Sequence, residues 1–169
     1  MRKLTIFSLV LFALGAFADD TPKKPLSPPQ EVKYTAGKGK DITINYSAPS
    51  KRGRAIMGGL VPYNQVWRTG ANAATTLTTT TDLMLGSLVV PAGKYTLYSI
   101  PGEKEWTLIV NKQTGQWGTN YDEKQDLGRV KMTVKPVKDT VEQFAIGIDA
   151  KALTLTWENT QASVPVMIH

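Results

Sequence analysis

The sequence predicts an all-β protein: a single antiparallel β-sandwich or barrel-like domain with one long functional loop. Three observations predict it. Apolar and polar residues alternate with the two-residue period of half-buried strands through most of the chain after residue 40. Turn residues interrupt this alternation about every eight to twelve residues, as in sandwiches and barrels. No segment sustains a helical period over several turns.

The first eighteen residues are expected to be a cleaved secretory signal peptide. The basic pair Arg2-Lys3 precedes an apolar run at 4–17, and Ala16-Phe17-Ala18 forms a small-residue cleavage site before Asp19. The apolar run is shorter than the roughly twenty residues that a membrane anchor requires. We therefore expect a chain that is exported to the periplasm or secreted, with no membrane span in the mature part.

Composition limits the classes of function. The chain has no Cys, so neither a disulfide framework nor a lipid-modified Cys is available. Without Arg2 and Lys3 the net charge is +4, and the basic residues cluster only at 51–54. A nucleic-acid-binding protein usually carries a basic stripe interleaved with aromatic residues, so no nucleic-acid partner is expected. The oligomeric state is left open.

The beginning of the mature chain separates into a leader and a domain. Residues 19–29 are proline-rich and polar, and we expect them to form a flexible leader. A single domain is expected over 30–169. Its first strands are expected at Gln30–Ala36 and Asp41–Ser47, because the Gly-Lys-Gly-Lys run between them favours a hairpin.

The remaining strands are expected wherever the alternation or β-branched residues continue. They are the threonine-rich 74–81, then 83–85, 88–90, 94–100 and 105–111, and the alternating stretches 130–134, 144–148, 153–157 and 164–168. Trp106 and Trp157 share the apolar register of their strands, so we expect both in the core. A short helix is expected at most near 63–67 or 122–126.

Several kinds of catalytic site are missing from the sequence. Thiol nucleophiles need Cys, and the single His is the terminal His169, so a His-based triad or a zinc site built on several His is not expected. The glycines at 53, 58 and 59 are not followed by the Gly-Lys-Ser/Thr of a phosphate loop. We therefore predict no metal, nucleotide or other cofactor. Asp122, Glu123 and Asp126 form the only local carboxylate cluster, which is either a set of solvated loop charges or part of a hydrolytic pair.

The segment Gly53–Thr76 combines permissive glycines with hydrogen-bonding and aromatic side chains more densely than any other. An Arg fork suits a carboxylate, phosphate or sugar hydroxyl, and Trp or Tyr offers a flat stacking face. The alternative is structural, because such side chains also satisfy loop carbonyls or, like Trp67, close the end of a sandwich. Trp117 either closes the core under a loop or forms a stacking platform. The candidate ligand-binding residues are Arg52, Arg54, Tyr63, Trp67, Arg68, Thr69, Asn72 and Trp117.

These residues carry a resemblance to a family. The runs Gly58–Tyr63, Val66–Asn72 and Ala74–Thr76, with later matches such as Pro91–Tyr95, resemble the exported bacterial proteins known as domain of unknown function 2911. The resemblance covers about 46–168 and implies a secreted or periplasmic β-rich domain. It implies no catalytic residue. The family often has Glu where this chain has Ala73, so a carboxylate present in relatives is absent here.

Three functions follow as hypotheses. The first is non-catalytic binding of a small polar or anionic ligand, such as a glycan fragment, at the Arg52–Asn72 loop. The second is a structural or partner-binding module of the cell envelope that uses exposed strand edges. The third is a hydrolase that uses Asp122 and Glu123 near that loop. A cleft beside the arginines favours the first, an open apolar edge the second, and convergent carboxylates the third.

Overall fold

The computed structural model describes residues 26–169, so the predicted signal peptide and most of the predicted leader lie outside the described residues. It confirms the all-β prediction: nine strands form one antiparallel sheet in the order β1-β2-β3-β6-β7-β8-β9-β4-β5. β1 and β5 end the sheet without pairing to each other, so it is not closed into a barrel. The strands are β1 (Pro29–Thr35), β2 (Asp41–Ser47), β3 (Thr76–Thr79), β4 (Leu83–Leu85), β5 (Leu88–Val90), β6 (Gly93–Ile100), β7 (Glu105–Asn111), β8 (Asp126–Ile148) and β9 (Ala152–Ile168).

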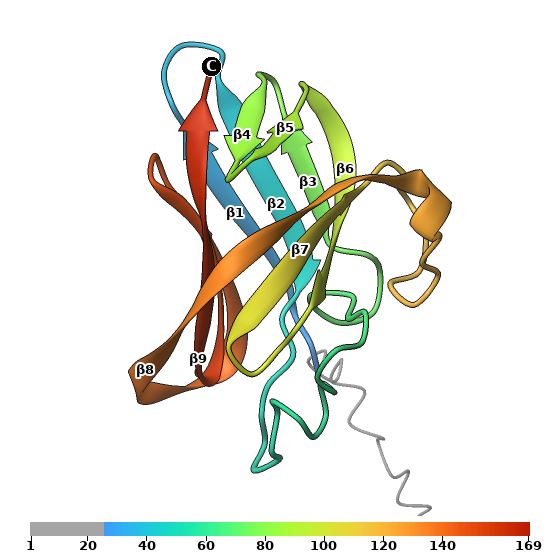
Figure 1. Ribbon diagram of the computed structural model, residues 1–169, viewed down its shortest axis with the longest axis vertical. Helices are drawn as coiled ribbons and strands as arrows, with labels where there is room; N and C mark the ends of the chain where they lie inside the picture. The colour runs from blue at the N-terminus through green and yellow to red at the C-terminus, as the bar shows by residue number, and fades with distance from the viewer. Residues whose placement is uncertain (1–25) are drawn as a thin grey trace, which may run out of the picture.

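Two long strands make the sheet double back (Figure 1). β8 pairs with β7 through its first residues and with β9 from Thr133 onward, with register shifts between Pro136 and Ala145. The stretches 130–134 and 144–148, expected as separate strands, therefore belong to one bent strand, and the two stretches expected after them belong to β9. The far half of β8 contacts the segment just after β2, where the Phe144 N–H donates to the Pro49 carbonyl at 2.8 Å.

The apolar core lies inside this folded sheet and draws residues from nearly every strand. Ile42, Ile44, Leu97, Leu108 and Leu155 are fully buried. Trp106 and Trp157 are each 1% exposed, which confirms the prediction that both are core residues. Burial of this alternating apolar face is the main stabilising term for a fold without disulfides.

Two local features differ from the sequence-based expectation, and a third agrees with it. The end of the predicted leader is bound to the fold, because β1 begins at Pro29 and the Pro28 carbonyl accepts the Ala48 N–H at 2.9 Å. The threonine-rich strand is shorter than expected, 76–79. Within residues 26–169 the only helical turn is the 3-10 turn Glu123–Gln125, and no helix there is long and apolar enough to cross a membrane.

Candidate functional site

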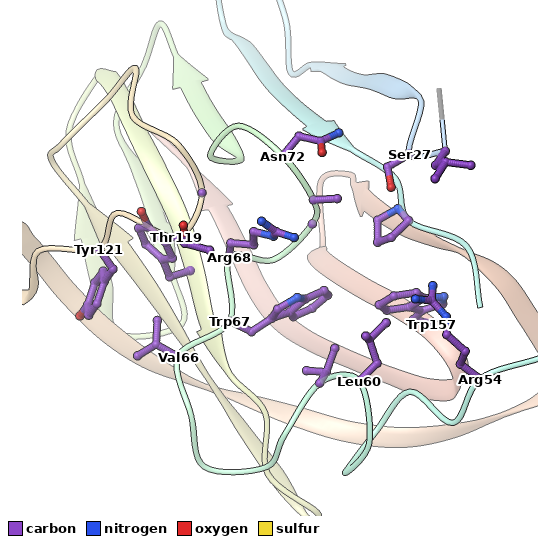
Figure 2. A pocket seen from close by; sticks show the side chains of 17 residues that line it. Ser27, Arg54, Leu60, Val66, Trp67, Arg68, Asn72, Thr119, Tyr121 and Trp157 are labelled. Atoms are coloured by element: carbon purple, nitrogen blue, oxygen red, sulfur yellow. The ribbon is translucent and has the colours of Figure 1, made fainter. Parts of the chain in front are cut away.

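A pocket of about 770 Å³ opens beside the segment between β2 and β3, residues 48–75. We call it the Arg68 pocket. That segment supplies ten of the seventeen lining residues, and the others come from the start of the described chain, from β6 and β9, and from the loop before β8 (Figure 2). The lining is Leu26, Ser27, Pro49, Arg54, Leu60, Val61, Val66, Trp67, Arg68, Gly70, Ala71, Asn72, Tyr98, Gly118, Thr119, Tyr121 and Trp157.

The Trp67-Arg68 pair is held against β6. Trp67 forms an antiparallel bridge with Ser99, with N···O distances of 2.7 and 3.0 Å. Thr69 is fully buried and left-handed, with φ of 52°, and its hydroxyl lies 2.9 Å from that of Ser99. The Thr69 carbonyl accepts the Thr75 hydroxyl at 2.8 Å. A left-handed backbone is costly for a β-branched residue, so these buried bonds are what holds the turn in place.

The floor of the pocket is aromatic. Trp67 is half-buried and stacks on Trp157, with ring centroids 5.9 Å apart and planes 18° from parallel. It also makes edge contacts with Phe144 at 4.9 Å and with Trp106 at 6.3 Å. The Trp157 indole donates to the Glu142 carbonyl at 3.1 Å, which fixes its plane. The pocket floor is therefore continuous with the core and pre-formed.

Arg68 has an unengaged head group. Its half-buried stem lies over Gly118, where an added Cβ would stand 2.7 Å from the Arg68 Cδ. Figure 2 shows the side chain extending toward the middle of the labelled residues. Among the described residues its guanidinium has no hydrogen-bond or ion-pair partner. Arg54, also in the lining, donates instead to the carbonyls of Lys51 at 3.0 Å and Ser50 at 2.7 Å.

The eight predicted site residues do not all meet. The structure places Arg54, Trp67, Arg68 and Asn72 in the lining, with Thr69 buried behind them.

The other three predicted residues lie elsewhere. The Arg52 guanidinium donates to the Leu26 carbonyl at 2.6 Å and ties the start of the described chain to the fold. The Tyr63 ring packs at Gly58. Trp117 is 53% exposed and does not line the pocket, so the interpretation that it closes the core is wrong. Its neighbour explains this, because Gly118 is buried and its N–H donates to the Asn72 carbonyl at 2.9 Å, which leaves the adjacent indole on the outside.

Tyr98 and Tyr121 form one wall of the pocket, the tyrosine wall, which the sequence did not indicate. Tyr98 on β6 contacts Tyr121, with ring centroids 4.8 Å apart. The Tyr121 hydroxyl donates to Asp126 at 2.7 Å and accepts from Arg129 at 2.9 Å. Burial, together with the hydrogen bond and charge of Asp126, raises the pKa of Tyr121 to about 12. The phenol is therefore neutral at physiological pH. The only sequence signal was the clustering of Asp and Glu next to Tyr121.

A partly buried ion pair between Lys51 and Glu158 holds the chain next to the pocket in place. The Lys51 ammonium lies 2.7 Å from the Glu158 carboxylate, which also accepts the backbone N–H groups of Ile56 and Met57 at 3.3 Å each. The hydrogen bond from Lys51, followed by the two from the backbone, lowers the pKa of Glu158. Glu158 itself is left-handed, with φ of 54°, at the bend of β9. Lys51 is therefore not free to bind an anion.

The lining contains no carboxylate and no imidazole, because none of its residues is Asp, Glu or His. Asp122 and Glu123 lie outside it, and Glu123 pairs with Arg129 at 2.6 Å. Across 26–169 no three His, Asp or Glu side chains converge on a point that could hold a metal ion. The charged side chains that face the pocket are both arginines, so the arrangement suits a neutral or anionic ligand.

The comparison with protein families gives one finding. The family described as "Protein of unknown function (DUF2911)" matches residues 27–166, so the chain belongs to that family. Neither the comparison with curated proteins nor that with solved structures gives a match.

Proposed function

We propose that this member of the DUF2911 family binds a small anionic ligand in the Arg68 pocket without transforming it. The observation that carries the proposal is the guanidinium of the half-buried residue Arg68, which faces a pre-formed pocket and has no partner among the described residues. A guanidinium partly removed from water gains most from a charged acceptor, because charge-assisted hydrogen bonds are about twice as strong as neutral ones.

The volume and lining of the pocket support a bound ligand, rather than bulk solvent, as the partner of Arg68. Its volume of about 770 Å³ lies within the range of roughly 300–1,000 Å³ common for small-molecule sites. Apolar and aromatic walls with few polar groups are also typical of such sites. A glycan-derived ligand meets the same requirement when it carries an acid group.

A thermal-shift screen tests the proposal. Protein from the full chain is melted with millimolar acetate, phosphate, glucuronate, glucose and longer carboxylates, beside Arg68→Ala and the control Lys135→Ala. Lys135 is exposed and its loss removes the same charge far along β8. Acidic compounds should raise the melting temperature of the wild type and the control, because binding to the native state stabilises it.

The same screen has two outcomes that contradict the proposal. One is a set of shifts that survive Arg68→Ala, because the anion would then bind elsewhere. The other is the absence of any shift together with a much lower melting temperature for Arg68→Ala, which assigns Arg68 a structural role. The partner-binding module would then be the better hypothesis.

We also propose that the protein is exported. The support is the sequence of 1–18, with its basic start, apolar run and small-residue site. Mass spectrometry of the protein recovered from the periplasm or medium of an expressing bacterium should give an N-terminus at Asp19. Retention in the cytoplasm with the first eighteen residues intact would contradict export.

A further inference from the structure

The rim of the Arg68 pocket is unusually apolar. Six large hydrophobic residues are exposed within 26–169, and three of them line this one pocket. Leu26 is 71% exposed, Leu60 is 47% exposed and Val66 is 41% exposed. Single exposed apolar residues need no explanation, but a group around a concave site marks a surface that binds apolar material.

The pocket offers one unengaged positive charge, which suits a ligand with one negative charge. Arg54 and Lys51 are engaged by carbonyls and by Glu158, and Arg52 by the Leu26 carbonyl. Arg68 is left as the single unengaged cation of the lining. One planar guanidinium pairs well with one carboxylate through two parallel hydrogen bonds, whereas a phosphate dianion usually meets more than one cation.

The space beyond Arg68 is much larger than a carboxylate needs. Trp67 and Trp157 line its floor, and in Figure 2 Trp67 lies between Arg68 and Leu60, with Trp157 farther toward Arg54. A ligand whose acid group sits on Arg68 therefore has an apolar floor beneath it and an apolar rim beyond.

We propose that the pocket takes an amphipathic monocarboxylate, with the acid group on Arg68 and an apolar body over Trp67 toward Leu60. This inference rests on the proposed function and adds the chemical class of the ligand. The apolar body is an alkyl chain or an aromatic ring, and the experiment separates these two sources.

Titration calorimetry on protein from the full chain tests the class. The probes are straight-chain carboxylates from butanoate to decanoate, 3-phenylpropanoate, octanamide, inorganic phosphate and glucuronate. Each added methylene should tighten binding by up to about fourfold, the ratio expected for burying one methylene. Octanamide should bind at least about tenfold more weakly than octanoate, because it lacks the charge that Arg68 meets. Tighter binding by 3-phenylpropanoate than by hexanoate would assign the apolar body to an aromatic ring, and the reverse order to an alkyl chain.

Matched variants locate the apolar contact. Leu60→Ser should flatten the dependence of affinity on chain length, whereas Val89→Ser should not. Val89 is 55% exposed on β5, outside the lining, and so removes a similar apolar surface elsewhere.

The outcomes separate this inference from the proposed function. Binding of phosphate or glucuronate that depends on Arg68 but shows no gain with chain length overturns the inference and leaves anion binding intact. Equal binding of octanamide and octanoate overturns the role of the charge. Failure of every acid to bind overturns both proposals.

Discussion

Replacing Trp106 with Ala tests how the core supports the pocket. Trp106 lies on β7 and is 1% exposed. Its ring makes an edge contact with the Trp67 ring, with ring centroids 6.3 Å apart and ring planes at 86°. Because Trp67 is also the pocket floor, loss of the Trp106 ring removes both core volume and support for the site.

The expected cost follows from three terms. Truncation of a buried Trp to Ala lowers the free energy of unfolding by about 3–5 kcal/mol. The lost aromatic pair contributes about 0.5–1.5 kcal/mol within that range. The Trp106 indole N–H is buried without a hydrogen-bond partner among residues 26–169, so its removal relieves part of the cost. We therefore expect a value near the lower end, about 3 kcal/mol.

Urea denaturation followed by circular dichroism measures this change. A loss of about 3 kcal/mol corresponds to a melting temperature lower by roughly 6–12 °C for a protein of this size. Trp106→Phe keeps a ring and removes the unpartnered N–H, so it should cost less than half as much. A loss below about 1 kcal/mol for Trp106→Ala at an unchanged m-value would refute the placement of this ring in the core.

Three further predictions concern the frame of the pocket. Thr69→Val removes the hydrogen-bond partner of the buried Ser99 hydroxyl on β6. It should lower the free energy of unfolding, measured by urea denaturation, by about 1–3 kcal/mol, whereas Thr133→Val at an exposed position should change it little. The folded-state pKa of Glu158 is depressed, so its contribution to stability is present above the ordinary value of 4.5 and is lost as the pH falls through the lower folded value. The melting temperature of Glu158→Gln should therefore depend less on pH in that window than that of the wild type. The same dependence of melting temperature on pH in both proteins would contradict the ion pair. Gly118→Ala places a methyl 2.7 Å from both the Arg68 Cδ and the Asn72 carbonyl oxygen. It should cost about 1–3 kcal/mol of stability by overpacking and should weaken carboxylate binding. Wild-type affinity would contradict the contact.

The strands were largely predictable from sequence. β2, β4, β5 and β7 match the expected ranges, because a two-residue period bounded by turn residues specifies a half-buried strand. The merging of stretches into β8 and β9 was not predictable. The residues between 134 and 144 fall outside the expected strands, yet β8 continues through them and pairs with β9 across register shifts.

The candidate site was partly predictable. The motif around Trp67 and Arg68 marked the segment that supplies most of the pocket lining. Which side chains face the pocket depends on long-range partners that no local pattern reveals. Arg52 is drawn away by a carbonyl of the leader, and the tyrosine wall combines β6 with a loop more than twenty residues later.

A crystal structure of the protein with octanoate tests the central claim most directly. We predict the carboxylate oxygens within hydrogen-bond distance of the Arg68 guanidinium and the chain over Trp67 toward Leu60. An empty pocket at saturating octanoate, or a ligand with its acid group directed to solvent or to Arg54, would contradict the account.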